Sequence, residues 1–358
     1  MIAEEAKMDF SETRKYIGHL DQLFNIKTFR YCGGKAEGML ATEVHNGAQL
    51  DVTIAADRCM DLYRVVFKGV NMSYLGGCGV VHPAYYDAQE DHWHKSFTAG
   101  MLTTCGLDHF GCACTDKGEQ LGLHGEIGNT PAEQYCVSVR EEDGIPAVHF
   151  QGVMKQARLF HEHFELERHY AIRYGVNEIE FEDIITNVGY RPWEFMQLYH
   201  FNYGYPFLNE NVQIFLPTLH IEPRDEAARR CLASWNRFEK PQDDAAEMCY
   251  FHTMGKNQNG ISGYTLYNPD LDIGVSCEYD GELLNRFIEW KSIGSGEYVL
   301  GMEPANAWVT GRAAVRNSGE LKMLPPQAKE KHRFLLRFLD GKKQLDEALE
   351  RQEQMKML

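Results

Sequence analysis

The chain has 358 residues, of which 44% are hydrophobic and 25% are charged, and its formal net charge is −16 at pH 7. This composition is ordinary for a soluble globular protein, and the negative charge makes nucleic acid and anionic membranes poor partners. The sequence has no apolar run long enough to span a membrane, and residues 1–20 lack the apolar core of a signal peptide, so we expect a cytoplasmic protein.

In chain order, the first predicted element is a short amphipathic helix over residues 9–24. Strand signals dominate after it. Residues 39–56 predict two strands joined by a turn at Asn46-Gly47, and residues 62–75 repeat this pattern.

Alternating apolar and polar residues continue far along the chain. Further strands are predicted within 134–154, 164–188, 194–204, 263–279 and 297–304. Only residues 341–357 are again strongly helical, and we expect a peripheral C-terminal helix there. Many strands with glycine turns and few helices predict an all-β protein, a large antiparallel β-sandwich. No proline- or serine-rich linker divides the chain, so we expect one domain over 1–358.

The longest irregular region, residues 76–135, carries histidines, cysteines and glycines. Long loops of this kind are often functional. The ten cysteines are scattered through the chain, and the closest pair, Cys112 and Cys114, has only one residue between them. This usage favours reduced, mostly buried thiols over a disulfide framework or a zinc site.

Two histidines stand where a sugar hydroxyl can reach them. His124 lies in a glycine-rich stretch, and glycines let a ligand approach the backbone closely. His200 follows a strand-like run with aromatic residues on both sides and Asn202 just after it. Aromatic faces stack on the C–H surface of pyranose rings, although tyrosine-rich strands are also ordinary β packing.

Two further segments carry charged side chains after apolar strands. Glu303 follows the run Val-Leu-Gly-Met, so its carboxyl is either solvated at the strand end or pointed into a pocket. Arg58 and Asp61 follow another apolar strand and form either a structural ion pair or a group that binds sugar hydroxyls.

An alternative site involves a metal ion. His161, His163 and Glu167 have the spacing of the first metal motif of the cupins, and two imidazoles with a carboxylate suit Mn, Fe or Zn. The second cupin motif is not evident downstream, and a polar solvent-facing strand explains the alternation equally well. We therefore predict no metal site.

Taken together, several segments resemble the galactose mutarotase-like superfamily, also called aldose 1-epimerases, and in particular a bacterial branch of uncharacterised members. The segments that carry the resemblance are residues 52–62, 97–111, 121–133, 198–208 and 299–308. The resemblance implies a large antiparallel β-sandwich with a carbohydrate cleft on one sheet, and an enzyme that interconverts the anomers of a sugar by general acid–base catalysis.

The resemblance also implies roles for individual residues. Glu303 would be the base on the anomeric hydroxyl, His200 the acid toward the ring oxygen, and His124 the histidine that holds the substrate. Further candidates for substrate binding are Arg58, Asp61, His109, Asn202 and Trp308.

An acid and a base on opposite sides of the sugar can carry out both proton transfers, and we expect this arrangement here, with nearby carboxylates favouring a charged His200. Spontaneous mutarotation is already feasible, so no cofactor is expected. Two alternatives stay open: a non-catalytic carbohydrate-binding protein, and a different sugar isomerase, epimerase or lyase that uses the same cleft. The terminal helices pack on the sandwich or against a second copy, so a homodimer also stays open.

Overall fold

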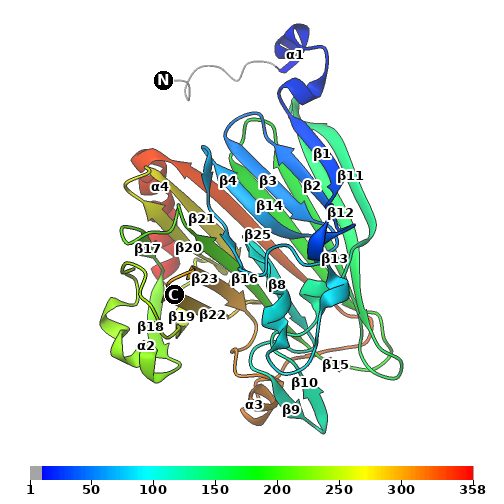
Figure 1. Cartoon of the computed structure of the whole chain (residues 1–358), viewed down its shortest axis with the longest axis vertical. Helices are drawn as coiled ribbons and strands as arrows, with labels where there is room; N and C mark the ends of the chain where they lie inside the picture. Colours follow the sequence, from blue (N-terminus) through cyan, green and yellow to red (C-terminus); the bar gives the residue numbers. More distant parts are fainter. Residues whose placement is uncertain (1–9, 358) are drawn as a thin grey trace.

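Alternating apolar residues fold most of this chain into antiparallel strands. The computed structural model describes residues 10–357 and contains three large sheets of five, six and eight strands (Figure 1). Strand neighbours in all three sheets run antiparallel. The predicted all-β sandwich is therefore confirmed.

The five-stranded sheet comes from the N-terminal part of the chain. Its turn after β2 forms because the Asn46 side-chain oxygen accepts from the backbone N–H groups of Ala48 and Leu50, and Gly47 adopts a positive φ of 78°. In order, the strands are β1 (Asn25–Arg30), β2 (Leu40–His45), β3 (Leu50–Ala55), β4 (Asp61–Phe67) and β5 (Val70–Asn71).

The eight-stranded sheet forms the broad back layer of the sandwich (Figure 1). In β13 and β14 buried residues alternate with more exposed ones, so one face of this sheet lies in the core. In order, the strands are β11 (Glu133–Glu142), β12 (Ile145–Ala157), β13 (His163–Arg173), β14 (Glu178–Asn187), β25 (Lys329–Asp340), β21 (Ile273–Asp280), β20 (Ile261–Asn268) and β17 (Gln213–Phe215).

The six-stranded sheet is covered on both faces. Every residue of its strand β16 is buried, including the polar ones. One face contributes Tyr199 and Phe201 to the main core, whereas Leu198 and Ile288 on the other face belong to a second apolar cluster. In order, the strands are β18 (Thr218–Pro223), β19 (Met248–Met254), β22 (Arg286–Gly294), β23 (Glu297–Ala305), β16 (Met196–Gly204) and β8 (Leu102–Leu107).

Aromatic rings join the eight-stranded and six-stranded sheets in the main core. Phe181 of β14 stacks on Phe334 of β25 with 4.5 Å between the ring centroids, and Tyr199 of β16 contacts the same Phe334 ring at 4.5 Å. Such pairs add to the free energy gained by burying large apolar surfaces. The packing fixes the orientation of β16, whose opposite face carries the candidate site.

Short strand pairs and helices complete the structure. The pairs are β6 (Tyr74–Leu75) with β7 (Ala99–Gly100), β9 (Cys114–Asp116) with β10 (Glu119–Leu121), and β15 (Trp193–Glu194) with β24 (Met323–Leu324). The α-helices are α1 (Phe10–Thr13), α2 (Glu226–Arg230), α3 (Arg312–Asn317) and α4 (Gly341–Glu353). Short 3₁₀ turns occur at Arg14–Tyr16, Leu20–Gln22, Gly34–Ala36, Pro83–Tyr85, His92–Ser96, Ile127–Asn129, Leu232–Ser234 and Gln354–Met357.

The N-terminal helix is shorter than the predicted 9–24. Only Phe10–Thr13 is α-helical, and residue 9 lies outside the described residues. The pattern breaks because the chain becomes extended at Ile17, and a new 3₁₀ turn begins after His19, whose ring Nδ1 accepts from the backbone N–H of Asp21.

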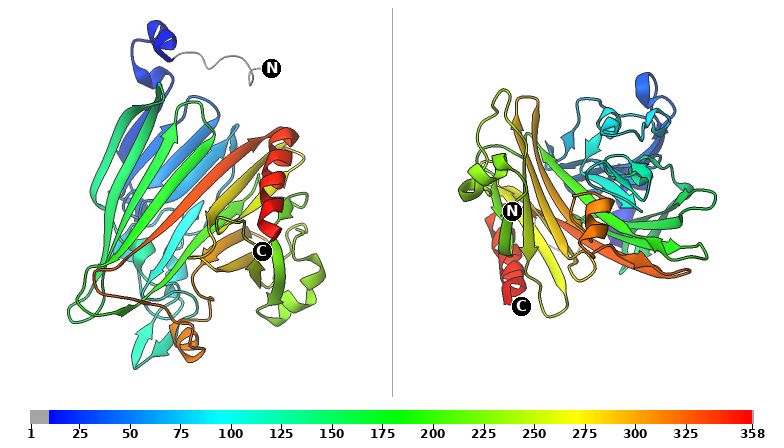
Figure 2. Two further views of the ribbon diagram at one scale, coloured as in Figure 1. Left: turned by 180° about the vertical axis from the view of Figure 1, so that it is seen from behind. Right: turned by 90° about the horizontal axis from the view of Figure 1, so that it is seen from below.

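At the other end, α4 and the 3₁₀ turn that follows it occupy the predicted 341–357. This helix packs against β20, β21 and β25 (Figure 2). Within residues 10–357, no helix has the length and apolar character needed to cross a membrane. The single domain over 1–358 stays a prediction.

Candidate active site

His200 and Glu303 are neighbours across two strands. The register of β16 and β23 pairs Leu198 with Ala305, and this register sets His200 opposite Glu303 on the same face of the sheet. The imidazole Nε2 lies 3.2 Å from the carboxyl Oε1. The predicted arrangement on opposite sides of a sugar is therefore corrected, because adjacent strands hold the two groups side by side.

Both side chains are buried yet keep unused polar atoms. His200 is 4% exposed and Glu303 is 2% exposed. Nδ1 of His200 and Oε1 of Glu303 have no hydrogen-bond partner, so the 3.2 Å approach is a contact without the alignment of a hydrogen bond. Buried polar groups are almost always satisfied in proteins, and unsatisfied ones beside a cavity indicate groups kept free for a ligand.

Burial sets the charges of this pair. It raises the pKa of the Glu303 carboxyl well above its usual value, with smaller effects from Arg224, which lowers that pKa, and from Glu247, which raises it. Burial also lowers the pKa of the His200 imidazole to about 3. Burial therefore favours a protonated carboxyl and a neutral imidazole in the free protein. The expectation of a charged His200 is wrong, because the loss of hydration outweighs the smaller, opposing effects of Asn202 and of a backbone hydrogen bond.

The pair opens into a pocket of about 200 Å³. Its walls are largely aromatic: Trp93 stacks on Phe97 at 4.4 Å between centroids, and Phe97 and Trp290 approach the His200 ring at 5.6 and 5.4 Å. The three walls were not predicted from the sequence. Trp93 and Phe97 come from the long irregular region, which offers no periodicity to mark them, and Trp290 has the pattern of an ordinary strand residue.

His124 completes the pocket from the irregular region. Its ring lies 5.7 Å from that of His200 between centroids, and its buried Nδ1 has no partner. The backbone holds it at a φ of +59°, where its N–H donates to the Gly111 carbonyl and its own carbonyl accepts from Gly106. A Cβ at the next residue, Gly125, would lie 2.3 Å from a backbone oxygen, so the loop requires glycine there.

His109 supports this loop and does not line the pocket. Its Nε2 contacts the Gly122 carbonyl at 2.8 Å, and its Nδ1 accepts from the backbone N–H of Arg312 at 3.3 Å. Burial, with a smaller effect from Arg312, lowers the pKa of His109 to about 4, so the ring is a neutral donor–acceptor. The prediction that His109 binds substrate is corrected: both ring nitrogens are already used.

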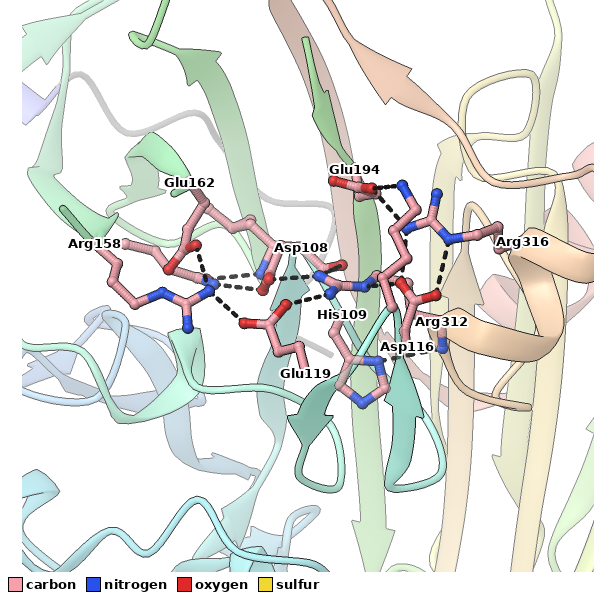
Figure 3. A network of polar contacts seen from close by, with 12 residues as sticks. Asp108, His109, Asp116, Glu119, Arg158, Glu162, Glu194, Arg312 and Arg316 are labelled. Atoms are coloured by element: carbon pink, nitrogen blue, oxygen red, sulfur yellow. Dashed lines mark hydrogen bonds and ion pairs between the residues drawn. The ribbon is translucent and has the colours of Figure 1, made fainter. Parts of the chain in front are cut away.

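A buried ion network surrounds His109 (Figure 3). The Arg312 guanidinium donates to Asp108 and Asp116 at 2.8 Å and to Glu119 at 2.6 Å. Arg316 of the same helix α3 also donates to Asp116. The network fastens the β9–β10 hairpin to α3 and thereby fixes one side of the region that carries His124.

Arg58 and Asp61 lie away from the pocket, in buried networks. Arg58 donates to the Val81 carbonyl at 3.0 Å and to Asn129 at 2.9 Å. Asp61 accepts from the backbone and hydroxyl of Thr104 and from Arg168. The substrate-binding role predicted for both is corrected, because the protein itself occupies their polar groups.

Asn202 and Trp308 also fall outside the pocket lining. The Asn202 amide donates to the backbone carbonyl of His200 at 2.8 Å, so it helps to shape the strand beneath the imidazole. Trp308 stacks on Phe251 at 4.6 Å, with the Arg286 guanidinium 5.1 Å from its ring centroid. Neither residue belongs to the lining of the pocket that contains Glu303.

Charged residues that the sequence did not single out lie at the pocket rim. Arg224 follows the end of β18, and its guanidinium donates to Glu247 at 2.7 Å. Glu247 also accepts from the indole N–H of Trp290 at 2.7 Å. No local signal marks Arg224 or Glu247, because the segments that carry them meet only through the pairing of β18 with β19.

Potential metal ligands do not converge in the described part of the chain: no group of three His, Cys, Asp or Glu side chains is placed to hold an ion. The three residues with cupin-like spacing include Glu167, which accepts from Gln151 and contacts His169. Larger cavities lie beside His149 and beside Trp193. Neither contains the His200–Glu303 pair.

Comparison with known proteins places this geometry in context. The family model described as "Domain of unknown function (DUF4432)" matches residues 36–338. The putative aldose 1-epimerase of Klebsiella pneumoniae superposes with a TM-score of 0.89 at 25% identity, over 94% of this chain and 90% of that one.

More distant structures share the fold. A galactose mutarotase-like protein of Clostridium acetobutylicum gives a TM-score of 0.60 at 12% identity, over 89% of this chain and 99% of that one. Galactose 1-epimerase of Lactobacillus acidophilus gives a TM-score of 0.57 at 14% identity, over 89% of this chain and 100% of that one. Curated protein sequences include none with significant similarity. The fold is galactose mutarotase-like, as the sequence resemblance predicted.

Proposed function

The chain belongs to the DUF4432 family, and we propose that it is an aldose 1-epimerase-like isomerase that interconverts the anomers of a sugar. The observation that carries the proposal is the buried contact between His200 and Glu303, whose unpartnered atoms border a pocket with aromatic walls. The galactose mutarotase-like fold and the names of its solved neighbours support the choice of reaction.

The side-by-side arrangement of the pair suits the chemistry of ring opening. One proton must leave the anomeric hydroxyl while another reaches the ring oxygen. Both oxygens are bonded to the same carbon, C1, so an acid and a base 3.2 Å apart can reach them together. The C1–O5 bond then breaks, the open-chain aldehyde rotates about C1–C2, and closure on the other face of the carbonyl returns both protons.

The pair holds one transferable proton in either of two arrangements. A neutral Glu303 with a neutral His200 contains as many protons as a carboxylate with an imidazolium. Each arrangement supplies one donor and one acceptor, and burial favours the neutral one in the free protein. The base on the anomeric hydroxyl is Glu303 in the charged arrangement and His200 in the neutral one.

The remaining walls hold the sugar. The unpartnered Nδ1 of His124 is free to bond a hydroxyl near the reacting carbon. The faces of Trp93, Phe97 and Trp290 supply apolar surface for the C–H groups of a pyranose. A water-poor pocket also strengthens each polar contact with the substrate. The proposed partner is thus a monosaccharide or a derivative, handled in the cytoplasm without a cofactor.

Magnetisation-transfer NMR on a panel of aldoses tests the proposal. The purified protein should accelerate α/β exchange of at least one sugar, and Glu303→Gln should abolish the acceleration. Deuterium uptake at carbon from D₂O would instead indicate carbon epimerisation or elimination. Saturable binding without acceleration of any sugar would indicate a carbohydrate-binding protein and would contradict the proposed reaction.

A further inference from the structure

The pocket rim carries a fixed charge arrangement. Arg224 is the only lysine or arginine that lines the pocket in the described part of the chain. It contacts the Glu247 carboxylate at 2.7 Å and the Asp225 carboxylate at 3.1 Å. One positive charge therefore contacts two negative charges at the rim of the pocket.

Glu247 is held in place on both of its oxygens. Oε1 accepts from Arg224, and Oε2 accepts from the indole N–H of Trp290, each at 2.7 Å. Trp290 is one of the aromatic walls beside His200. The carboxylate is thus tied to the wall of the pocket, although 54% of its side chain remains exposed.

The same two charges act on the candidate catalytic carboxyl. Burial dominates the raised pKa of Glu303, Arg224 lowers that pKa, and Glu247 raises it further. Arg224 also helps to lower the pKa of His124, after the larger effects of burial, His200, His109 and His94. The charges at the rim therefore act on both Glu303 and His124, which line the proposed sugar site.

We propose that Glu247 is a specificity-determining residue that closes this pocket to anionic sugars by neutralising Arg224. The proposal rests on the proposed function only in taking this pocket as the sugar site. A carboxylate or phosphate on the substrate meets two protein carboxylates and a guanidinium that is already paired. A neutral hydroxymethyl group finds hydrogen-bond donors and acceptors in the same pair without bringing a like charge.

Replacing Glu247 by glutamine should reverse this selection. Glutamine has the same shape, and its oxygen still accepts from Trp290, so the wall stays in place. The Arg224 guanidinium then keeps only Asp225 as a charged partner and becomes available to an anion.

A matched control exists on the same sheet. Arg286 contacts Glu320 at 2.9 Å and lies over the Trp308 ring, so this exposed pair repeats the arginine–glutamate–tryptophan grouping outside the pocket. Glu320→Gln removes the same charge from the protein without changing the pocket rim.

The experiment measures binding of two sugar pairs that differ only at C6, D-galactose with D-galacturonate and D-glucose with D-glucuronate, by NMR titration. Wild type should prefer the neutral sugar, and Glu247→Gln should shift the ratio of dissociation constants toward the uronate by about tenfold or more. Glu320→Gln should leave that ratio within about twofold of wild type. The gain in uronate affinity should shrink as salt screens the guanidinium.

The inference is overturned if Glu247→Gln leaves the ratio unchanged, if Glu320→Gln shifts it equally, if wild type prefers the uronate, or if wild type binds none of the four sugars. Thermal unfolding midpoints confirm that each variant is folded. Anomer exchange is recorded in the same samples. Selective binding without exchange would defeat the proposed reaction and leave the charge selection intact.

Discussion

Gly301 leaves the space that the Glu303 side chain occupies. A Cβ added to Gly301 would lie 2.7 Å from Oε1 of Glu303 and 3.1 Å from Cε1 of His200. Residues that are two positions apart on a strand point to the same face of the sheet, as Gly301 and Glu303 do. The absence of a side chain at Gly301 is therefore what allows the carboxyl and the imidazole to meet.

Gly301→Ala should lower anomer exchange by about 10²-fold, because the methyl group pushes the carboxyl away from the imidazole and proton transfer depends on position. Exchange rates by NMR measure the loss. Gly294→Ala is the control, since its Cβ would meet nothing closer than 3.4 Å. Full activity of Gly301→Ala would show that the contact is not needed.

Glu303→Gln and His200→Gln should each lower anomer exchange by about 10²–10⁴-fold, because each removes one of the two proton-transfer groups. The matched control is Glu289→Gln. Glu289 is a fully buried carboxyl that contacts His252 at 3.1 Å on the opposite face of the same sheet, and its pKa is also raised by burial. Retained exchange in Glu289→Gln with loss in Glu303→Gln assigns the effect to the pocket.

The stability of the protein should depend on pH through Glu303. Burial raises its pKa above the ordinary 4.5, so the folded state keeps a proton that the unfolded state loses. The contribution of Glu303 to the free energy of unfolding is fully present below about pH 4.5. It is lost as the pH rises through the pKa of the folded state. Between the unfolded and the folded pKa, the free energy of unfolding falls by about 1.4 kcal/mol for each step of one in pH. Glu303→Gln removes this loss.

Thermal melts of wild type and Glu303→Gln across about pH 4 to 8, a range that begins near the ordinary glutamate pKa of 4.5, measure the difference. The glutamine variant should be the more stable protein at the alkaline end, and its advantage should vanish at the acid end. An equal difference at every pH would mean that folding does not raise the pKa of the carboxyl.

The ion network around His109 should matter for stability. Arg312→Met leaves the buried Asp108 without its guanidinium and leaves Asp116 with Arg316 alone, so it should cost about 3–5 kcal/mol in the free energy of unfolding. Arg333→Met, which breaks an ion pair with Glu182 on a side chain that is 70% exposed, should cost at most about 1 kcal/mol. Urea denaturation measures both, and similar small losses would contradict a structural role for the network.

Local sequence signals were sufficient for most of the sheets. The Asn46-Gly47 turn and the alternation around it predict β2 and β3, because the side chain of Asn46 and the positive φ of Gly47 act within a few residues. In the three large sheets, the strands that were not identified are β1, β8, β17, β18, β19, β22 and β25. Four of them belong to the six-stranded sheet, whose strands β8, β16 and β18 come from distant segments of the chain.

The site was predicted in part. The resemblance selected His124, His200 and Glu303, and the fold brings all three into one pocket. It also selected as substrate-binding residues Arg58 and Asp61, which follow an apolar strand in the sequence just as Glu303 does. Which polar pair faces a cavity depends on the layer packed over it. The charges of His200 and Glu303 could not be predicted from the sequence either, because their hydration is lost only when the whole pocket forms.

The two parts of the pocket differ in how they are built. His200 and Glu303 belong to paired strands whose hydrogen-bond ladder fixes their spacing, whereas Trp93, Phe97 and His124 come from connecting segments. Substitutions in those segments can therefore change the shape of the pocket without altering the spacing of the pair. If the proposed reaction is correct, such a scaffold lets the preference for a sugar evolve, or be engineered, without a change in the spacing of His200 and Glu303.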